Sequence, residues 1–200
     1  PNASPDPAIR FRELVRAIKF VWASTFFTAA KSYIRATEQR IRDEKMAVII
    51  QEVVGRRHGD RFYPDLSGVA RSYNFYPASR SKPEEGVTNL ALGLGKAIVD
   101  GGVSWSYSPA RPTAPPPFAS VDDQLKNTQV RFFAVNLGQP LEDDPLREDE
   151  HLLDLDLSEA ERDGSLRYVA STLDPNSRRL SPGTGFKGPR VLNFAPLLSL

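Results

Sequence analysis

The sequence predicts an α+β fold, and three features of its apolar pattern indicate this class. Apolar residues recur at helical spacing near the start, residues 46–54 are largely apolar, and shorter runs of alternating character follow further along. Helical spacing indicates an amphipathic helix, whereas continuous or alternating short apolar runs indicate buried or half-buried strands. Because both patterns occur in one chain, we expect a mixed sheet that is flanked by helices.

Two helices are expected before the first strand. Asp6 followed by Pro7 is typical of a helix start, because an aspartate accepts from free N–H groups and proline fits the first helical position. One face of this helix should be buried, through the apolar residues Leu14, Val15, Ile18, Val21 and Trp22. A second helix is expected over residues 25–42, with an inner face that contains Phe26, Tyr33, Ile34 and Ile41.

The remaining elements are mainly strands joined by short loops. Residues 46–54 should form a strand covered on both faces, because the first five of these residues are all apolar. A polar hairpin-type turn is expected at residues 56–60. Further strands are expected at residues 69–76, 87–92, 103–107, 129–137 and 166–172, with short helices at 94–99 and 158–163. Ser158 should cap the second of these helices.

A proline-rich segment divides the chain. Residues 109–117 contain five prolines, which are incompatible with a helix or the interior of a sheet. We therefore expect one lobe over residues 1–108, a stiff linker over 109–117, and the remainder of the structure over 118–200. The chain lacks an initiator methionine and ends in an apolar run, so we expect a piece of a longer protein. That run should promote self-association through Phe194, Leu197, Leu198 and Leu200.

Composition and charge narrow the classes of function. Hydrophobic residues make up 40% and charged residues 26% of the 200-residue chain, which is ordinary for a soluble globular domain. The formal net charge of +1 argues against binding to nucleic acid or to an anionic membrane. The absence of cysteine excludes disulfides and thiolate chemistry, and no apolar run approaches the ~20 residues of a membrane span. A cytoplasmic protein is therefore expected.

The end of the first predicted strand is a candidate binding site for a purine. Gln51 and Glu52 form a polar pair that is followed by Val53 and Val54. Backbone groups at a strand end can hydrogen-bond to the edge of a purine, while apolar side chains cover the ring and polar ones contact the ribose. The alternative is a plain core strand whose polar end reaches solvent.

A glycine segment further along is a candidate for phosphate binding. Gly93 and Gly95 flank Leu94 and are followed by Lys96. Backbone N–H groups in such a turn, together with a cation, are suited to a phosphate group. The alternatives are a tight turn with a helix cap for the glycines and a surface position for the lysine. Taken together with the strand end, the segment predicts a nucleotide pocket.

The other ionisable candidates give weaker indications. His58 and His151 are the only histidines, and both are expected at the surface. Asp154 and Asp156 alternate on a short predicted strand, which would place both carboxylates on one face. Their acidic surroundings favour a solvated position over a metal site. We therefore predict neither a catalytic residue nor a metal ligand in the chain.

Four segments, taken in order, resemble one protein family. They are residues 17–36 (AIKFVWASTFFTAAKSYIRA), 46–55 (MAVIIQEVVG), 67–77 (SGVARSYNFYP) and 90–102 (LALGLGKAIVDGG). Together they are similar to the nucleotide-binding domain of the phosphoenolpyruvate synthase and pyruvate phosphate dikinase family. The resemblance covers residues 8–110 most closely. It implies an ATP-grasp fold, in which ATP lies between two α+β lobes.

The resemblance implies a phosphotransferase that uses ATP and Mg²⁺. ATP would phosphorylate a histidine on a separate swivelling domain, and that histidine would pass the phosphate to pyruvate or another acceptor. Gln51 matches a glutamine of the family, whereas many relatives carry an acidic residue at the position of Lys96. The Mg²⁺ ligands are expected outside this chain, so it should not catalyse the reaction alone. The alternative is a non-catalytic regulatory or interaction module that retains the same scaffold.

Overall fold

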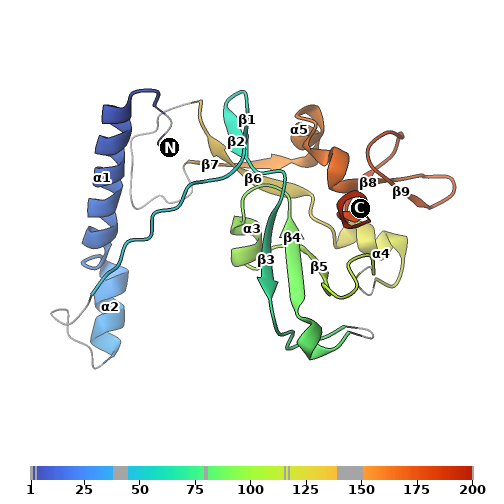
Figure 1. Cartoon of the computed structure of the whole chain (residues 1–200), viewed down its shortest axis with the longest axis horizontal. Coiled ribbons are helices and arrows are strands. Elements are labelled where there is room, and N and C mark those ends of the chain that lie inside the picture. Colours follow the sequence, from blue (N-terminus) through green and yellow to red (C-terminus); the bar gives the residue numbers. More distant parts are fainter. Residues whose placement is uncertain are drawn as a thin grey trace. The chain divides into compact units, whose positions relative to one another are not determined.

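The computed structural model describes residues 2, 4–37, 45–78, 81–114, 116, 118–138 and 151–199. The described residues up to Val53 belong to one compact unit, and those from Val54 onwards belong to a second. Helices and strands both occur, which confirms the α+β class (Figure 1). The domain limits that we expect from the sequence stay predictions, and the proline-rich segment lies within the second unit.

The first unit begins with helix α1 (Pro7–Ser24). Its predicted start is confirmed, because the Asp6 side chain accepts a hydrogen bond of 2.8 Å from the Ala8 N–H and Pro7 lies in the first turn. The predicted buried face is wrong for the described structure, since no residue of α1 is buried. Trp22, which we expected on that face, is 54% exposed.

Helix α2 (Thr28–Ala36) covers part of the second predicted helix and ends before Thr37. Ile34 is its buried residue, whereas Phe26 and Tyr33, which we expected on the inner side, are exposed. Residues 38–44 lie outside the described part of the chain, so the predicted extension to residue 42 stays a prediction.

The strand predicted at residues 46–54 is not present. Residues 45–55 adopt neither strand nor helix, and Ile49 and Val54 are 82% and 75% exposed. A buried strand needs neighbouring strands for its backbone groups and a covering layer for each face. Within the described residues no strand pairs with this segment, so its apolar composition alone does not produce the expected element.

The strands of the second unit form three antiparallel sheets among the described residues (Figure 1). One has the order β1-β2-β6-β7 and contains β1 (Arg56–His58), β2 (Arg61–Tyr63), β6 (Arg131–Asn136) and β7 (Leu152–Asp156). A second has the order β3-β4-β5 and contains β3 (Ser67–Arg71), β4 (Val87–Ala91) and β5 (Trp105–Tyr107). The third has the order β10-β8-β9 and contains β8 (Ala170–Leu173), β9 (Leu180–Pro182) and β10 (Arg190–Leu192).

Short helices lie between these strands: η2 (Pro83–Glu85), α3 (Lys96–Val99), α4 (Val121–Lys126), α5 (Leu157–Arg162) and η3 (Ser165–Tyr168). A further short helix, α6 (Ala195–Leu198), follows β10. Helix α5 occupies the place of a predicted helix, but its cap is Asp156 instead of Ser158. The Asp156 side chain accepts a hydrogen bond of 2.8 Å from the Ser158 N–H. None of the described helices combines the length and the apolar character of a membrane span.

The core of the second unit joins all three sheets. Tyr63 from β2 and Phe132 from β6 are fully buried, and their ring centroids are 4.8 Å apart. Trp105 from β5 and Leu192 from β10 belong to the same buried cluster. Phe118 lies beyond the proline-rich segment and packs against Trp105, with ring centroids 5.8 Å apart. The segment therefore connects residues that share one core.

The apolar run near residue 200 packs against this core. Phe194 is 1% exposed, and Leu198 lies against the same buried cluster. We expected both side chains to be open to solvent, and this expectation is wrong because α6 contacts β8 and η3. Leu197 is partly buried, and Leu200 lies outside the described residues.

The sheet β3-β4-β5 has two unlike faces. Successive side chains of a strand point to opposite faces, so the pairing register assigns each residue to one of them. Leu90 and Trp105 pair with each other and belong to the core. Asn89 pairs with Val69 of β3 and with Ser106 of β5, and these residues lie on the opposite face. We call this the outer face of the sheet.

Candidate functional site

The predicted site residues are divided between the two units. Three residues of the predicted purine site, Gln51, Glu52 and Val53, belong to the first unit and are exposed. Val54 is also exposed but belongs to the second unit, as does the glycine segment with Gly93, Gly95 and Lys96. The glycine segment connects β4 to α3. The whole segment therefore lies within one compact unit.

Gly93 has a structural reason to be glycine. Its φ of +77° is in the left-handed region, which side chains disfavour. A Cβ atom at this position would lie 2.7 Å from the Phe133 carbonyl oxygen, which is closer than real contacts allow. The Gly93 carbonyl accepts a hydrogen bond of 2.6 Å from the Ser67 hydroxyl. These contacts attach the turn to β3 and β6, so packing alone explains this glycine.

Packing does not explain the residues at positions 95 and 96 in the same way. Gly95 has a φ of −63°, and a Cβ atom there would meet only the Ser67 Cβ at 3.8 Å. Neither backbone strain nor close packing therefore requires a glycine at this position. The Lys96 ammonium pairs with Asp100 at 2.7 Å and lies 5.8 Å from the centre of the Phe133 ring. Its charge is partly offset within the protein.

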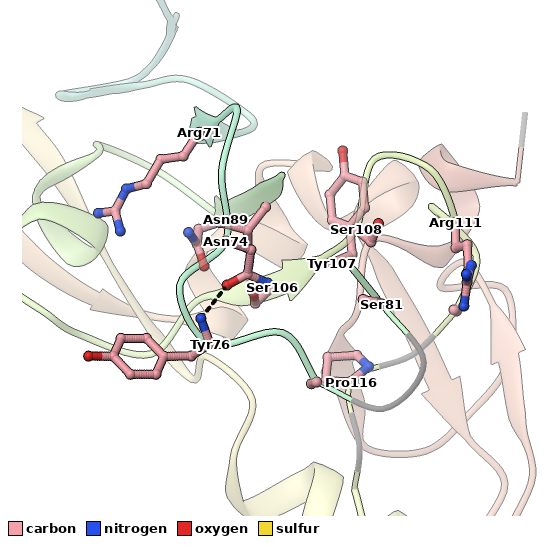
Figure 2. Close-up of a pocket in the computed structure, with 13 residues that line it drawn as sticks. Arg71, Asn74, Tyr76, Ser81, Asn89, Ser106, Tyr107, Ser108, Arg111 and Pro116 are labelled. Atoms are coloured by element: carbon pink, nitrogen blue, oxygen red, sulfur yellow. Dashed lines mark hydrogen bonds between the residues drawn. The ribbon is translucent and has the colours of Figure 1, made fainter. Parts of the chain in front are cut away.

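A pocket of about 560 Å³ lies on the outer face of the β3-β4-β5 sheet. The sheet contributes Arg71, Asn89 and Ser106, and the loops after β3 and β5 contribute further walls. Figure 2 shows Arg71 and Arg111 at opposite sides of the pocket, with Asn89 and Ser106 between them. Arg71 is four residues from Ser67 along β3, about 13 Å at the usual rise of a strand, so the pocket is distant from the glycine turn.

Sequence reasoning did not identify this pocket. Its walls come from segments that are separate in the chain, namely the loop near Asn74 and the loop near Arg111. The available signal was weak, because β4 reads Val-Thr-Asn-Leu-Ala and does not alternate between polar and apolar residues. The polar Asn89 beside the apolar Leu90 indicates an outward position, but it does not show which loops cover it.

One wall of the pocket is held by a carboxylate behind it. Glu85 accepts a hydrogen bond of 2.8 Å from the Ser108 hydroxyl and pairs with Arg111 at 3.2 Å. The hydrogen bond from Ser108 is the main reason why the pKa of Glu85 lies below its ordinary value. An ionised Glu85 therefore fixes the loop after β5 against η2.

A second charged cluster is structural. The Arg61 guanidinium pairs with Asp163 and with Glu159, each at 2.7 Å. The Tyr63 hydroxyl also contacts Asp163 at 2.8 Å, and burial raises the pKa of this phenol well above its ordinary value. These contacts connect β2 to α5. The hydrogen bond to Asp163 is the main reason why the pKa of Arg61 lies above its ordinary value.

The histidines and the paired aspartates have other partners. His58 is half-buried and stacks on Tyr63 with ring centroids 4.9 Å apart, and His151 is also half-buried, so neither lies freely at the surface as expected. Asp154 pairs with Arg131 at 3.0 Å, and Asp156 caps α5. The described residues contain no group of three or more side chains that could hold a metal ion.

The comparisons with known proteins identify a family. The model of the AMP/ATP-binding domain of pyruvate phosphate dikinase matches residues 9–164. This match extends from α1 to the end of α5 and includes the predicted strand end, the glycine segment and the pocket. No curated protein and no solved structure gives a significant match. Because the matched segment covers well over half of the sequence, the chain belongs to the family of pyruvate phosphate dikinase AMP/ATP-binding domains.

Proposed function

We propose that the chain binds an adenine nucleotide and forms the nucleotide-binding part of an ATP-dependent phosphotransferase. The observation that carries this proposal is the family match over residues 9–164. The mixed composition of the matched region, with exposed apolar residues beside polar ones, is compatible with contacts to a base and to a phosphate. In the wider reaction, ATP phosphorylates a histidine on a mobile domain and the phosphate then passes to pyruvate or a related acceptor.

The purine is assigned to the strand-end segment. Gln51 and Glu52 contact the ribose and the base edge through backbone and side-chain groups, and Val53 and Val54 cover the ring. All four residues are exposed, so their side chains are accessible to a ligand. Burial of a purine against two apolar side chains with two backbone hydrogen bonds corresponds to about −4 to −6 kcal/mol, or millimolar to tens of micromolar affinity.

The phosphates are assigned to the glycine segment. Gly95 is the stronger candidate for close approach, because the structure gives no packing reason for a glycine there. Gly93 orients the turn, and Lys96 supplies a cation whose charge Asp100 partly offsets. Phosphoryl transfer also needs Mg²⁺ and further cations for charge neutralisation. We propose that residues beyond this chain supply the Mg²⁺ ligands.

Calorimetric titration with ATP tests the assignment of the purine. Val54→Lys places a bulky charge beside the ring, and it should raise the dissociation constant at least about tenfold, or ~1.4 kcal/mol. Val54 is 75% exposed, so the substitution should leave the fold intact. Val130→Lys is the matched control, because Val130 is also exposed but lies outside the assigned site. Equal ATP affinity in the wild-type and Val54→Lys proteins would show that the purine binds elsewhere.

A further inference from the structure

The pocket on the outer face of the β3-β4-β5 sheet has a positively charged lining. Arg71 and Arg111 both line it, and its lining residues include no aspartate or glutamate. Such a pocket repels cations and attracts anions, because its walls carry two guanidinium groups and no carboxylate. A guanidinium group also matches the planar geometry of a carboxylate or phosphate with two parallel N–H donors.

The two arginines differ in how their charges are used. Arg111 pairs with Glu85, which holds it in place and offsets part of its charge. Arg71 is exposed, and its guanidinium forms no ion pair or hydrogen bond with any residue that the structure describes. Its five N–H donors are therefore available to a ligand. Arg111 acts as a fixed positive wall, and Arg71 is the cation that can reorient towards a bound group.

Neutral hydrogen-bond donors lie between the two arginines. Asn89 and Ser106 pair across β4 and β5 on the outer face, and both line the pocket. The carbonyl oxygen of the Asn74 side chain accepts from the Tyr76 N–H at 3.0 Å, which leaves the Asn74 amide N–H groups for a ligand (Figure 2). Amide and hydroxyl donors of this kind complete the coordination of an oxyanion without adding charge.

The size of the pocket indicates an organic ligand. Its volume of about 560 Å³ exceeds that of a single inorganic anion and is within the range of small-molecule sites. Val87 and Ala114 supply apolar surface beside the donors. The lining therefore provides both a region for an oxyanion and a region for a carbon skeleton.

We propose that this pocket binds a small organic oxyanion, which carries a phosphate or a carboxylate group. Arg71 is the principal contact of the charged group, and Asn89 and Ser106 donate hydrogen bonds to it. Glu85 is a positioning residue, because it orients Ser108 and Arg111 from behind the wall without lining the pocket. The site is distinct from the residues assigned to the adenine nucleotide, and its occupation requires no nucleotide.

Titration of the ¹⁵N-labelled chain with three probes that share one ring tests this proposal. Phenyl phosphate and benzoate carry the two candidate oxyanions, and neutral benzamide carries none. We expect at least one anion to bind with a dissociation constant of a few millimolar or below and to shift the amide signals of Arg71, Asn89 and Ser106. Benzamide should bind at least about tenfold more weakly. Binding of phenyl phosphate alone identifies a phosphate site, and binding of benzoate alone identifies a carboxylate site.

Three variants connect the binding to the pocket. Arg71→Gln should weaken binding of the anion at least about tenfold, and Arg71→Lys should recover part of the loss. Asn89→Asp has nearly the same shape and should also weaken binding, because it introduces a negative charge between the arginines. Arg179→Gln is the matched control, since Arg179 is also an exposed arginine but lies outside the pocket, and it should change nothing.

Several results would overturn the proposal. They are the absence of binding by both anions, equal affinities for the anions and benzamide, and unchanged binding in both Arg71→Gln and Asn89→Asp. Signal shifts confined to residues 93–96 would also overturn it, because they would place the anion at the glycine segment. The nucleotide proposal is tested separately by Val54→Lys, so the failure of one proposal does not imply the failure of the other.

Discussion

The two units of the protein contain similar patterns of apolar residues, but they bury these side chains to very different degrees. In the first unit, α1 carries apolar residues at helical spacing but none is buried, and Ile49 is 82% exposed. In the second unit, Tyr63, Phe132 and Leu166 are fully buried, and they come from two strands and a 3₁₀ helix that meet around one core. The comparison shows that an apolar pattern predicts the face of an element, whereas burial depends on a second element that covers it.

The largest expected effect compares one aromatic residue from each unit. Phe132→Ala removes a fully buried ring that packs against Tyr63, and it should lower the free energy of unfolding by about 3–5 kcal/mol. Trp22→Ala removes a ring that is already half exposed, and it should cost less than about 1 kcal/mol. Urea denaturation followed by circular dichroism measures both values. Equal losses would show that α1 has a covered face and that the comparison is wrong.

The next largest effect on stability compares a mostly buried and an exposed carboxylate of the second unit. Asp163→Asn removes the carboxylate that accepts from both Arg61 and Tyr63, and it should cost about 1–3 kcal/mol. The control is Asp122→Asn, because Asp122 pairs with Arg178 at the exposed surface, where an ion pair contributes little to stability, so its loss should be clearly smaller. The same denaturation experiment applies. A larger loss for Asp122→Asn would contradict the assignment of the Arg61 cluster as the structural one.

The two glycines of the predicted phosphate turn provide a smaller and sharper contrast. Gly93→Ala introduces a left-handed alanine close to the Phe133 carbonyl, and it should cost about 1–3 kcal/mol. Gly95→Ala should change the free energy of unfolding by less than about 0.5 kcal/mol, because the added methyl group has space. If Gly95 approaches the phosphates, this second variant should instead weaken ATP binding. Similar stability losses in both variants would contradict the contrast.

The smallest expected effect is a change in the pKa of one carboxyl group, that of Glu85. The pKa of Glu85 lies below its ordinary value in the folded protein, so this group stabilises the fold above its unfolded pKa of about 4.3. The contribution is lost as the pH falls through the lowered folded-state pKa. A ¹³C titration of the carboxyl signal should show the lowered pKa in the wild-type protein. Ser108→Ala should move it upwards, because the hydroxyl of Ser108 is its main cause; an unchanged pKa would exclude this hydrogen bond as the cause.

Local features of the fold were predictable from the sequence. Asp6 and Pro7 begin α1 as expected, because an N-cap and its proline depend on adjacent residues only. The turn predicted at residues 56–60 is also present but narrower, because residues 56–58 form β1 and only residues 59–60 form the turn, where Gly59 adopts the left-handed backbone that a tight turn uses. The strands β4, β5 and β6 also lie where the pattern places them, with shorter bounds.

Features that depend on distant partners were not predictable. Residues 46–54 have the composition of a buried strand, but no described strand pairs with them. Phe194 belongs to an apolar run that we expect to promote self-association, whereas its side chain is 1% exposed and shares a buried cluster with Leu166 of η3 and Ala170 of β8. The pocket between Arg71 and Arg111 requires two loops that lie far apart in the sequence. The family resemblance identified the class of ligand, but not this pocket.

The most direct test of the nucleotide assignment is an ATP titration of the ¹⁵N-labelled chain, followed by amide chemical shifts. We expect saturable shifts at residues 51–54 and 93–96, from the purine and the phosphates respectively. Phenyl phosphate or benzoate should instead shift the signals of Arg71, Asn89 and Ser106. Saturable ATP binding that leaves both residues 51–54 and residues 93–96 unperturbed would contradict the assignment, and an absence of ATP-dependent shifts throughout the chain would contradict nucleotide binding itself.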